Sequence, residues 1–209
     1  KRGVVACASY NARKFGVHAG MPNIQAVRLC PKLIFITPNF DKYMEVSDEL
    51  RKVLFNFSPY VEMFSIDEAF LDVTGCARLW GTPLQMVSRV KSLVKSRTGL
   101  NCSVGIAPTK YLAKYAAGVN KPSGFFIIPP EKLRDILPQI PVKKISGVGP
   151  QFQKILKRLG VVKLGDVLKF PEEYWRSRLG KVGYWLYNIA KGKELEPVTP
   201  VTNAKSMGK

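Results

Sequence analysis

The sequence is poor in acids, in histidine and in long apolar runs. It has 15 Asp and Glu against 33 Lys and Arg, one histidine and four cysteines (Cys7, Cys30, Cys76 and Cys102). The cysteines form no C-x-x-C pair, so we expect reduced thiols and no zinc site. No apolar run approaches the ~18 residues of a membrane-spanning helix, and the start has no secretory signal. These absences argue against a membrane or secreted protein and predict a cytoplasmic one.

What the chain has in abundance is basic charge and apolar side chains. Its 209 residues carry a formal net charge of +18, and 46% of them are hydrophobic. Such a chain can bury a core in one large domain or in two to three small ones. A strongly basic balance most often means a nucleic-acid partner, and a basic surface without a specific partner is the alternative. The chain opens on an apolar run without an initiator Met, so we expect a piece of a longer fold.

Hydrophobic periodicity predicts alternating helices and strands over the first 130 residues. The expected helices cover 9–16, 21–31, 41–57, 82–99 and 109–120, and the expected strands cover 3–7, 61–66, 69–74, 102–107 and 124–130. Thr82 is the expected N-cap of its helix, Pro83 its first residue and Gly99 its stop. Helices over one sheet predict an α+β sandwich. After residue 130, short helices separated by glycine turns run to about residue 195.

Two adjacent acids, Asp67 and Glu68, interrupt the strand-like stretch FSIDEAFLD. Neighbours in a regular strand point to opposite faces, so both acids serve one site only if the chain turns there as an antiparallel hairpin. Converging carboxylates repel each other unless a cation lies between them, and Mg²⁺ takes carboxylate and phosphate oxygens. The alternative is a solvated turn acid beside a capping acid.

Two sets of basic residues suit a phosphate-rich ligand. Tyr10 and Arg13 are three apart in an expected helix and therefore share a face, and a guanidinium binds phosphate oxygens as a planar fork. The alternative is a solvated arginine beside a half-buried tyrosine. Lys110 and Lys114 lie one turn apart and Lys121 follows at the end of that helix. A solvated lysine face explains the first two equally well.

A glycine turn is the most specific pattern in the last third of the chain. Gly147, Val148 and Gly149 lie between two short expected helices, with charge nearby from Lys154 and its neighbours. Glycines let the backbone approach a phosphate, and a helix N-terminus supplies N–H donors. We therefore predict a helix-hairpin-helix that grips the DNA backbone without reading bases. A structural turn is the alternative, and residues 178–185 offer a possible second, degenerate hairpin.

Four ordered stretches together resemble a known family. SYNARKFGVHAGMP, SIDEAFLDVT, SVGIAPTKYLAKYAAGVNKPSG and KKISGVGP look like the Y-family translesion DNA polymerases, most similar to the bacterial DNA polymerase IV type. The resemblance implies an α+β fold with small fingers at 1–37 and a ferredoxin-like palm sandwich at 38–129. It further implies an all-helical thumb with a helix-hairpin-helix at 130–196 and, at 197–209, a linker toward an absent little-finger domain.

The resemblance also implies roles for individual residues. Asp67 and Glu68 would be the catalytic, metal-binding carboxylates. Nucleotide binding would involve Cys7, Tyr10, Arg13 and Lys121, and DNA binding would involve Gly147, Val148, Gly149 and Lys154. Cys7 departs from the family's usual Ser or Thr, and a thiol is a weaker hydrogen-bonding partner. A further metal-binding Asp and a ribonucleotide-excluding aromatic would precede residue 1, so we expect little or no activity from residues 1–209 alone.

The function implied is template-directed addition of dNTPs to a primer 3′-hydroxyl with two Mg²⁺ ions. The implied partners are primer–template DNA, dNTP and, through the absent C-terminal region, a sliding clamp, for a monomer without a membrane association. A non-catalytic helix-hairpin-helix DNA-binding module is the main alternative. A metal-dependent nuclease is a weaker one, because it has no use for a triphosphate pocket.

Overall fold

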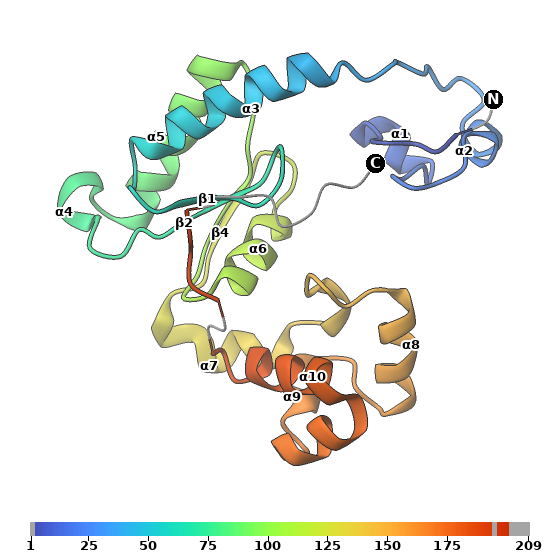
Figure 1. The fold of residues 1–209 in the computed structure, drawn as a ribbon, viewed down its shortest axis with the longest axis vertical. Coiled ribbons are helices and arrows are strands. Elements are labelled where there is room, and N and C mark those ends of the chain that lie inside the picture. The colour runs from blue at the N-terminus through green and yellow to red at the C-terminus, as the bar shows by residue number, and fades with distance from the viewer. Residues whose placement is uncertain (1–2, 194–195, 201–209) are drawn as a thin grey trace. The chain divides into compact units, whose positions relative to one another are not determined.

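The chain divides into two compact units, Lys1–Phe40 and Asp41–Lys209. The structure is a computed structural model that describes residues 3–193 and 196–200 (Figure 1). The predicted linker at 197–209 therefore falls mostly outside the described residues. Within the described part, no helix has both the length and the apolar character needed to cross a membrane.

The first unit is built on two short helices, α1 (Tyr10–Lys14) and α2 (Asn23–Leu29). The Ser9 hydroxyl caps α1 by accepting a hydrogen bond from the Ala12 N–H at 3.2 Å. The small core consists of Val5, Ala8, Ala12, Val17, Met21 and Ala26. The predicted strand over 3–7 is wrong, because Val4 makes an isolated bridge to Pro22, and a proline has no N–H with which to extend a ladder.

Two long helices of the second unit, α3 (Phe40–Phe55) and α5 (Pro83–Thr98), lie side by side (Figure 1). Val53 and Phe57 pack against Val94 in the cluster between them. The predicted ends of α5 are confirmed: Thr82 and Gln85 form a capping box, Pro83 opens the helix, and Gly99 ends it in the left-handed conformation. A short helix, α4 (Ala77–Trp80), precedes α5.

The described strands pair as two separate two-stranded sheets. β1 (Val61–Met63) pairs antiparallel with β2 (Ala69–Leu71), and β3 (Val104–Ile106) pairs parallel with β4 (Phe125–Ile127). The α+β class is confirmed, whereas the single sheet that we predicted is not seen among these strands. Each strand pairs with the next strand along the chain: a hairpin turn connects β1 to β2, and the helix α6 (Lys110–Val119) connects β3 to β4.

Close packing of α6 on β3 depends on a glycine. A Cβ added at Gly105 would collide with the backbone of α6 at Ala113 and Ala117. The strand can therefore approach this helix only where it has no side chain. In this way, Gly105 fixes the surface from which α6 presents its lysines.

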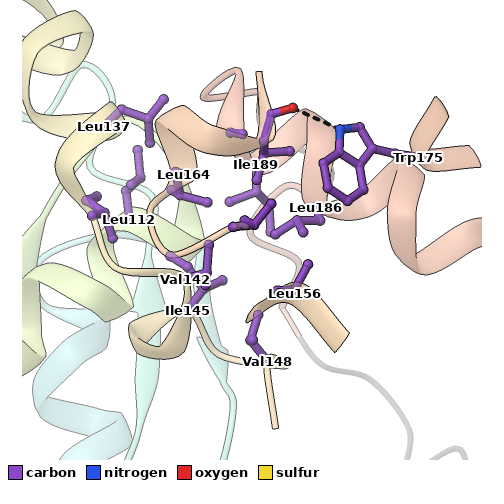
Figure 2. Close-up of a cluster of buried hydrophobic side chains, with 14 of the residues drawn as sticks. Leu112, Leu137, Val142, Ile145, Val148, Leu156, Leu164, Trp175, Leu186 and Ile189 are labelled. Carbon is purple, nitrogen blue, oxygen red and sulfur yellow. Dashed lines mark hydrogen bonds between the residues drawn. The ribbon is translucent and has the colours of Figure 1, made fainter. Parts of the chain in front are cut away.

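The remainder of the second unit is helical, as predicted. Its elements are three 3-10 turns (Pro130–Lys132, Leu137–Gln139 and Val142–Lys144) and the helices α7 (Leu133–Ile136), α8 (Pro150–Arg158), α9 (Leu164–Val167) and α10 (Glu172–Ala190). Figure 2 shows their shared core, in which the fully buried Trp175 donates from Nε1 to the Val167 carbonyl at 2.8 Å. Leu112 and Ala116 of α6 belong to the same cluster, so α6 and these helices share one core.

Helix α10 is broken at Gly180, which adopts φ 59° and ψ −138°. The helical segments on either side lie so close together that a Cβ at the buried Gly183 would collide with the Trp175 carbonyl. The stretch 178–185, left open above as a second hairpin, thus contains a glycine break between two packed helical segments.

Candidate functional site

Asp67 and Glu68 lie in the turn that joins β1 to β2. The Phe64 and Ser65 N–H groups both donate to the Glu68 carbonyl, at 2.9 and 3.1 Å, and close this turn. The Ser65 hydroxyl donates to Asp67 Oδ1 at 2.9 Å, and Asp67 is exposed. The prediction that the two acids sit where an antiparallel hairpin turns is confirmed.

One face of this hairpin carries acids and aromatic rings that meet α6. Strand alternation places Glu62, Phe64, Glu68 and Phe70 on the same face, since Glu62 lies opposite Phe70 in the register. Two lysines from α6 pair with the two acids of this face. Lys110 Nζ contacts Glu62 Oε2 at 2.7 Å, and Lys114 Nζ contacts Glu68 Oε2 at 2.6 Å.

Each of these ammonium groups also lies over an aromatic ring of the same face. Lys110 Nζ is 5.3 Å from the Phe70 ring centroid and Lys114 Nζ is 4.3 Å from that of Phe64, distances at which a cation is attracted to the ring. The interpretation of Lys110 and Lys114 as a solvated lysine face is therefore wrong. Spacing along the helix could not show this, because the partners come from a distant hairpin.

The two ion pairs differ in their access to solvent. The Lys110 and Glu62 side chains are each only 12% exposed, and Glu62 also accepts from the Thr199 N–H at 3.0 Å. In the second pair, Lys114 is 27% and Glu68 41% exposed. The Glu62 carboxylate is therefore occupied by buried contacts that stabilise the fold, whereas the Glu68 carboxylate remains accessible to a ligand from solution.

An open groove of about 440 Å³ runs along this face. Its lining includes Phe64, Lys114, Tyr111, Gly147, Lys181 and Trp185. Trp185 of α10 donates from Nε1 to the Tyr111 hydroxyl of α6 at 3.0 Å, and the two rings meet edge to face. The groove therefore brings the acidic hairpin and the glycine turn into one basic and aromatic surface.

The chemistry of Asp67 and Glu68 fits a hard divalent cation. Both offer carboxylate oxygens, and Mg²⁺ is typically held by one or two protein carboxylates together with substrate phosphates. Across residues 3–193 and 196–200, no group of three or more His, Cys, Asp or Glu converges. Any third protein carboxylate of such a site would therefore come from outside these described residues, with water or a phosphate-bearing substrate as further ligands.

Tyr10 and Arg13 do share a face of α1, as predicted. The Arg13 guanidinium carbon lies 5.3 Å from the Tyr10 ring centroid, and Nε donates to the Ala8 carbonyl at 2.9 Å. Both side chains are exposed, and so is Cys7. The Cys7 thiol makes only a weak, 4.0 Å contact with the Ala8 carbonyl.

Lys121 is exposed in the loop that follows α6. Sequence reasoning missed the residue that ties this loop to α5: Lys91 Nζ donates to the carbonyls of Cys102 and Ser123. A signal was present, because Lys91 falls on the apolar stripe of α5, four residues after Val87. Burial raises the pKa of the Cys102 thiol, and the nearby Lys91 ammonium offsets part of that rise.

In the glycine turn, Gly147 has a φ of 95° and Gly149 directly precedes α8. Val148 is buried, its N–H donates to the Ile145 carbonyl at 3.1 Å, and its carbonyl accepts from Gln153 Nε2 at 2.9 Å. Val148 thus anchors the turn from inside. Lys154 is exposed on α8, where it offers charge to a ligand.

Two family models match the chain. The impB/mucB/samB family model matches residues 1–118, and a model described as "DNApol eta/Rev1, HhH motif" matches residues 140–193. The second match confirms the predicted helix-hairpin-helix and also covers the glycine break in α10.

Curated relatives carry a polymerase name. The chain is 40% identical over 209 residues to a protein named DNA polymerase IV from Clostridium perfringens, which covers all of this chain and 58% of the relative. It is 37% identical over 207 residues to a protein of the same name from Alkalilimnicola ehrlichii, covering 99% of the chain and again 58% of the relative. The chain thus spans little more than half the length of these relatives.

Solved structures show the same fold. A crystal structure of DinB from Sulfolobus solfataricus superposes with a TM-score of 0.85 at 33% identity, covering 94% of this chain and 58% of that one. An insertion ternary complex of Dbh DNA polymerase gives the same TM-score, identity and coverage. The chain therefore shares its fold with these two proteins, the second of which bears a polymerase name.

Proposed function

The chain belongs to the impB/mucB/samB family, and on this premise we propose that it carries catalytic machinery of a template-directed translesion DNA polymerase. The observation that carries the proposal is the acidic hairpin: Glu68 is 41% exposed and pairs with Lys114, which lines a groove that also reaches the glycine turn at Gly147. The polymerase names of the relatives support the same assignment.

The proposed reaction is nucleotidyl transfer. The primer 3′-hydroxyl loses its proton to water, its oxygen bonds to the α-phosphorus of a dNTP, the bond from that phosphorus to the α–β bridging oxygen breaks, and pyrophosphate leaves. Asp67 and Glu68 would hold the Mg²⁺ ions, which when bound help to activate the hydroxyl and stabilise the leaving oxygen. Lys114 orients the Glu68 carboxylate through the 2.6 Å contact, and Ser65 orients Asp67 through its hydroxyl.

The charge of the triphosphate would be met by exposed basic side chains. Arg13 and Tyr10 provide a guanidinium and a phenol on one face of α1, and Lys121 provides an ammonium in the second unit. Each can donate to phosphate oxygens as negative charge moves to the leaving pyrophosphate. Cys7 would contribute little, because its thiol is a weak donor.

DNA would be held in the groove between α6 and the helix-hairpin-helix. The backbone at Gly147 and Gly149, with Lys154 and Lys181 nearby, suits phosphate oxygens without discrimination between bases. Exposed lysines and a close backbone approach account for sequence-independent binding, which a copying enzyme requires.

A melting experiment tests the nucleotide site. Mg²⁺ with a dNTP should raise the melting temperature of the protein, because a ligand at about 100 times its Kd increases the free energy of unfolding by about 2.7 kcal/mol. Arg13→Ala and Lys121→Ala should reduce the rise, whereas Lys14→Ala, an exposed change on the same helix as Arg13, should leave it intact. An identical rise in all variants would remove Arg13 and Lys121 from the site.

The second candidate is a non-catalytic DNA-binding module. The specific observation in its favour is the helix-hairpin-helix match over residues 140–193. Such a module would bind duplex DNA with a steep dependence on salt concentration and would not respond to Mg²⁺ and dNTP. The melting experiment therefore separates the two candidates.

A further inference from the structure

The loop of residues 120–125, which carries Lys121, is held in place by a lysine on a neighbouring helix. We propose that Lys91 is a positioning residue for nucleotide binding, one that holds this loop so that Lys121 can receive the triphosphate. The inference rests on the proposed function, since it concerns the same triphosphate. Lys91 itself does not have to touch the nucleotide.

The contacts of Lys91 join three segments of the second unit. Its Nζ donates to the Cys102 carbonyl at 2.7 Å, just before β3, and to the Ser123 carbonyl at 2.5 Å. Hydrogen bonds from an ammonium are roughly twice as strong as those between neutral groups. One side chain of α5 therefore fixes both the start of β3 and the loop that follows α6.

The rest of the loop is also tightly determined. Asn120 Nδ2 donates to the Phe125 carbonyl at 2.9 Å, and the Val104 N–H donates to the Gly124 carbonyl at 3.2 Å. A Cβ at Gly124 would collide with the Asn120 carbonyl, so the chain turns there with no room for a side chain.

Ser123 adopts a left-handed conformation with φ 57°. A residue other than glycine keeps this conformation only where the surroundings impose it, and such residues gather at functional sites. The carbonyl that Lys91 holds belongs to this same residue. Without the ammonium, Ser123 would lose a contact that keeps the loop, and hence Lys121, in this arrangement.

The test uses steady-state primer extension by the complete polypeptide that contains this chain. Lys91→Met keeps the length of the side chain but removes its donors. We expect the KM for dNTP to rise about five-fold, which is less than the roughly ten-fold effect of losing a hydrogen bond to a charged group that contacts the nucleotide directly. The kcat should change less than two-fold. Lys95→Met is the matched control, because Lys95 lies one turn further along α5 and donates to the Gly99 carbonyl at the end of its own helix.

A double-variant comparison separates positioning from a general loss of stability. If Lys91 acts through Lys121, the variant with Lys91→Met and Lys121→Ala should have the KM of Lys121→Ala alone, since the two changes remove one function. Hydrogen exchange at the backbone amides of Lys121, Ser123, Gly124 and Phe125 should also speed up in Lys91→Met and not in Lys95→Met.

The other possible KM results of these variants would each overturn a specific claim. If Lys121→Ala raises the KM and Lys91→Met does not, or if the two effects multiply, the positioning role of Lys91 is wrong and the proposed function stands. If Lys121→Ala leaves the KM unchanged, the loop has no triphosphate role and this inference fails with it. The roles of Asp67 and Glu68 would be untouched by that result.

Discussion

Replacing Lys110 with methionine should destabilise the second unit strongly. The change removes the ammonium that meets both Glu62 oxygens, at 2.7 and 2.8 Å, where each side chain is only 12% exposed. Leaving one partner of a buried ion pair behind costs about 3–5 kcal/mol. Because Glu62 keeps its bond from the Thr199 N–H at 3.0 Å, we expect the lower end of that range.

Urea unfolding followed by tryptophan fluorescence measures this cost directly. All three tryptophans, Trp80, Trp175 and Trp185, lie in the second unit, so their signal reports on it. With a slope of about 2 kcal/mol per M urea, a loss of about 3 kcal/mol lowers the midpoint by about 1.5 M. The control is Lys52→Met, whose pair with Glu49 is 74% and 36% exposed; it should cost less than about 1 kcal/mol.

A double-variant cycle then shows whether the cost comes from the pair. Lys110→Met combined with Glu62→Gln should be less damaging than the sum of the two single changes, by about 1 kcal/mol or more. A loss from Lys110→Met as small as that from Lys52→Met would refute the reasoning. It would mean that Lys110 is an ordinary solvated lysine.

Two further predictions concern the helical part of the second unit. Gly147→Ala should weaken DNA binding and stability more than Gly160→Ala, because both have positive φ but only the Cβ at Gly147 meets a ring, that of Trp185 at 3.2 Å; filter binding and urea unfolding of both variants test this. The hydrogen bonds from Lys169 Nζ and from the N–H groups of Lys163 and Val162 lower the pKa of Asp166 from 3.8 to about 2. Since that pKa is lower in the folded chain, the carboxylate stabilises the fold above pH 3.8 and loses this effect as the pH falls toward 2. Asp166→Asn should thus cost about 1 kcal/mol near pH 7 and almost nothing at pH 2, and a cost that stays constant with pH would argue against this contribution.

Local signals in the sequence predicted the local features well. Thr82, Pro83 and Gly99 predict the ends of α5 because capping and left-handed glycine depend on nearby residues alone. The turn at Asp67 and Glu68 was predictable for the same reason, since two strands that flank adjacent acids leave little choice. The glycine turn between two short helices was predictable from the local residues as well, and Gly147 has a φ of 95° there.

Features that depend on distant partners were not predictable. The pairing of Lys114 with Glu68 spans 46 residues and is set by how α6 packs on the hairpin. The strand expected over 3–7 failed because its neighbour proved to be Pro22. The place of Lys91 on the apolar stripe of α5 marks it as unusual, but its partners could not be predicted because they are backbone carbonyls, which every residue has.

The most direct test of the central claim is primer extension by the complete polypeptide with the hairpin acids neutralised. Asp67→Asn and Glu68→Gln preserve size and remove charge, and each should lower the rate of extension by about 10²-fold or more while DNA affinity stays near that of the unchanged protein. Glu45→Gln, an exposed acid on α3 that pairs with Lys42, should extend normally. Extension at the unchanged rate by the Asp67 or Glu68 variant would contradict the assignment of that residue to the catalytic site.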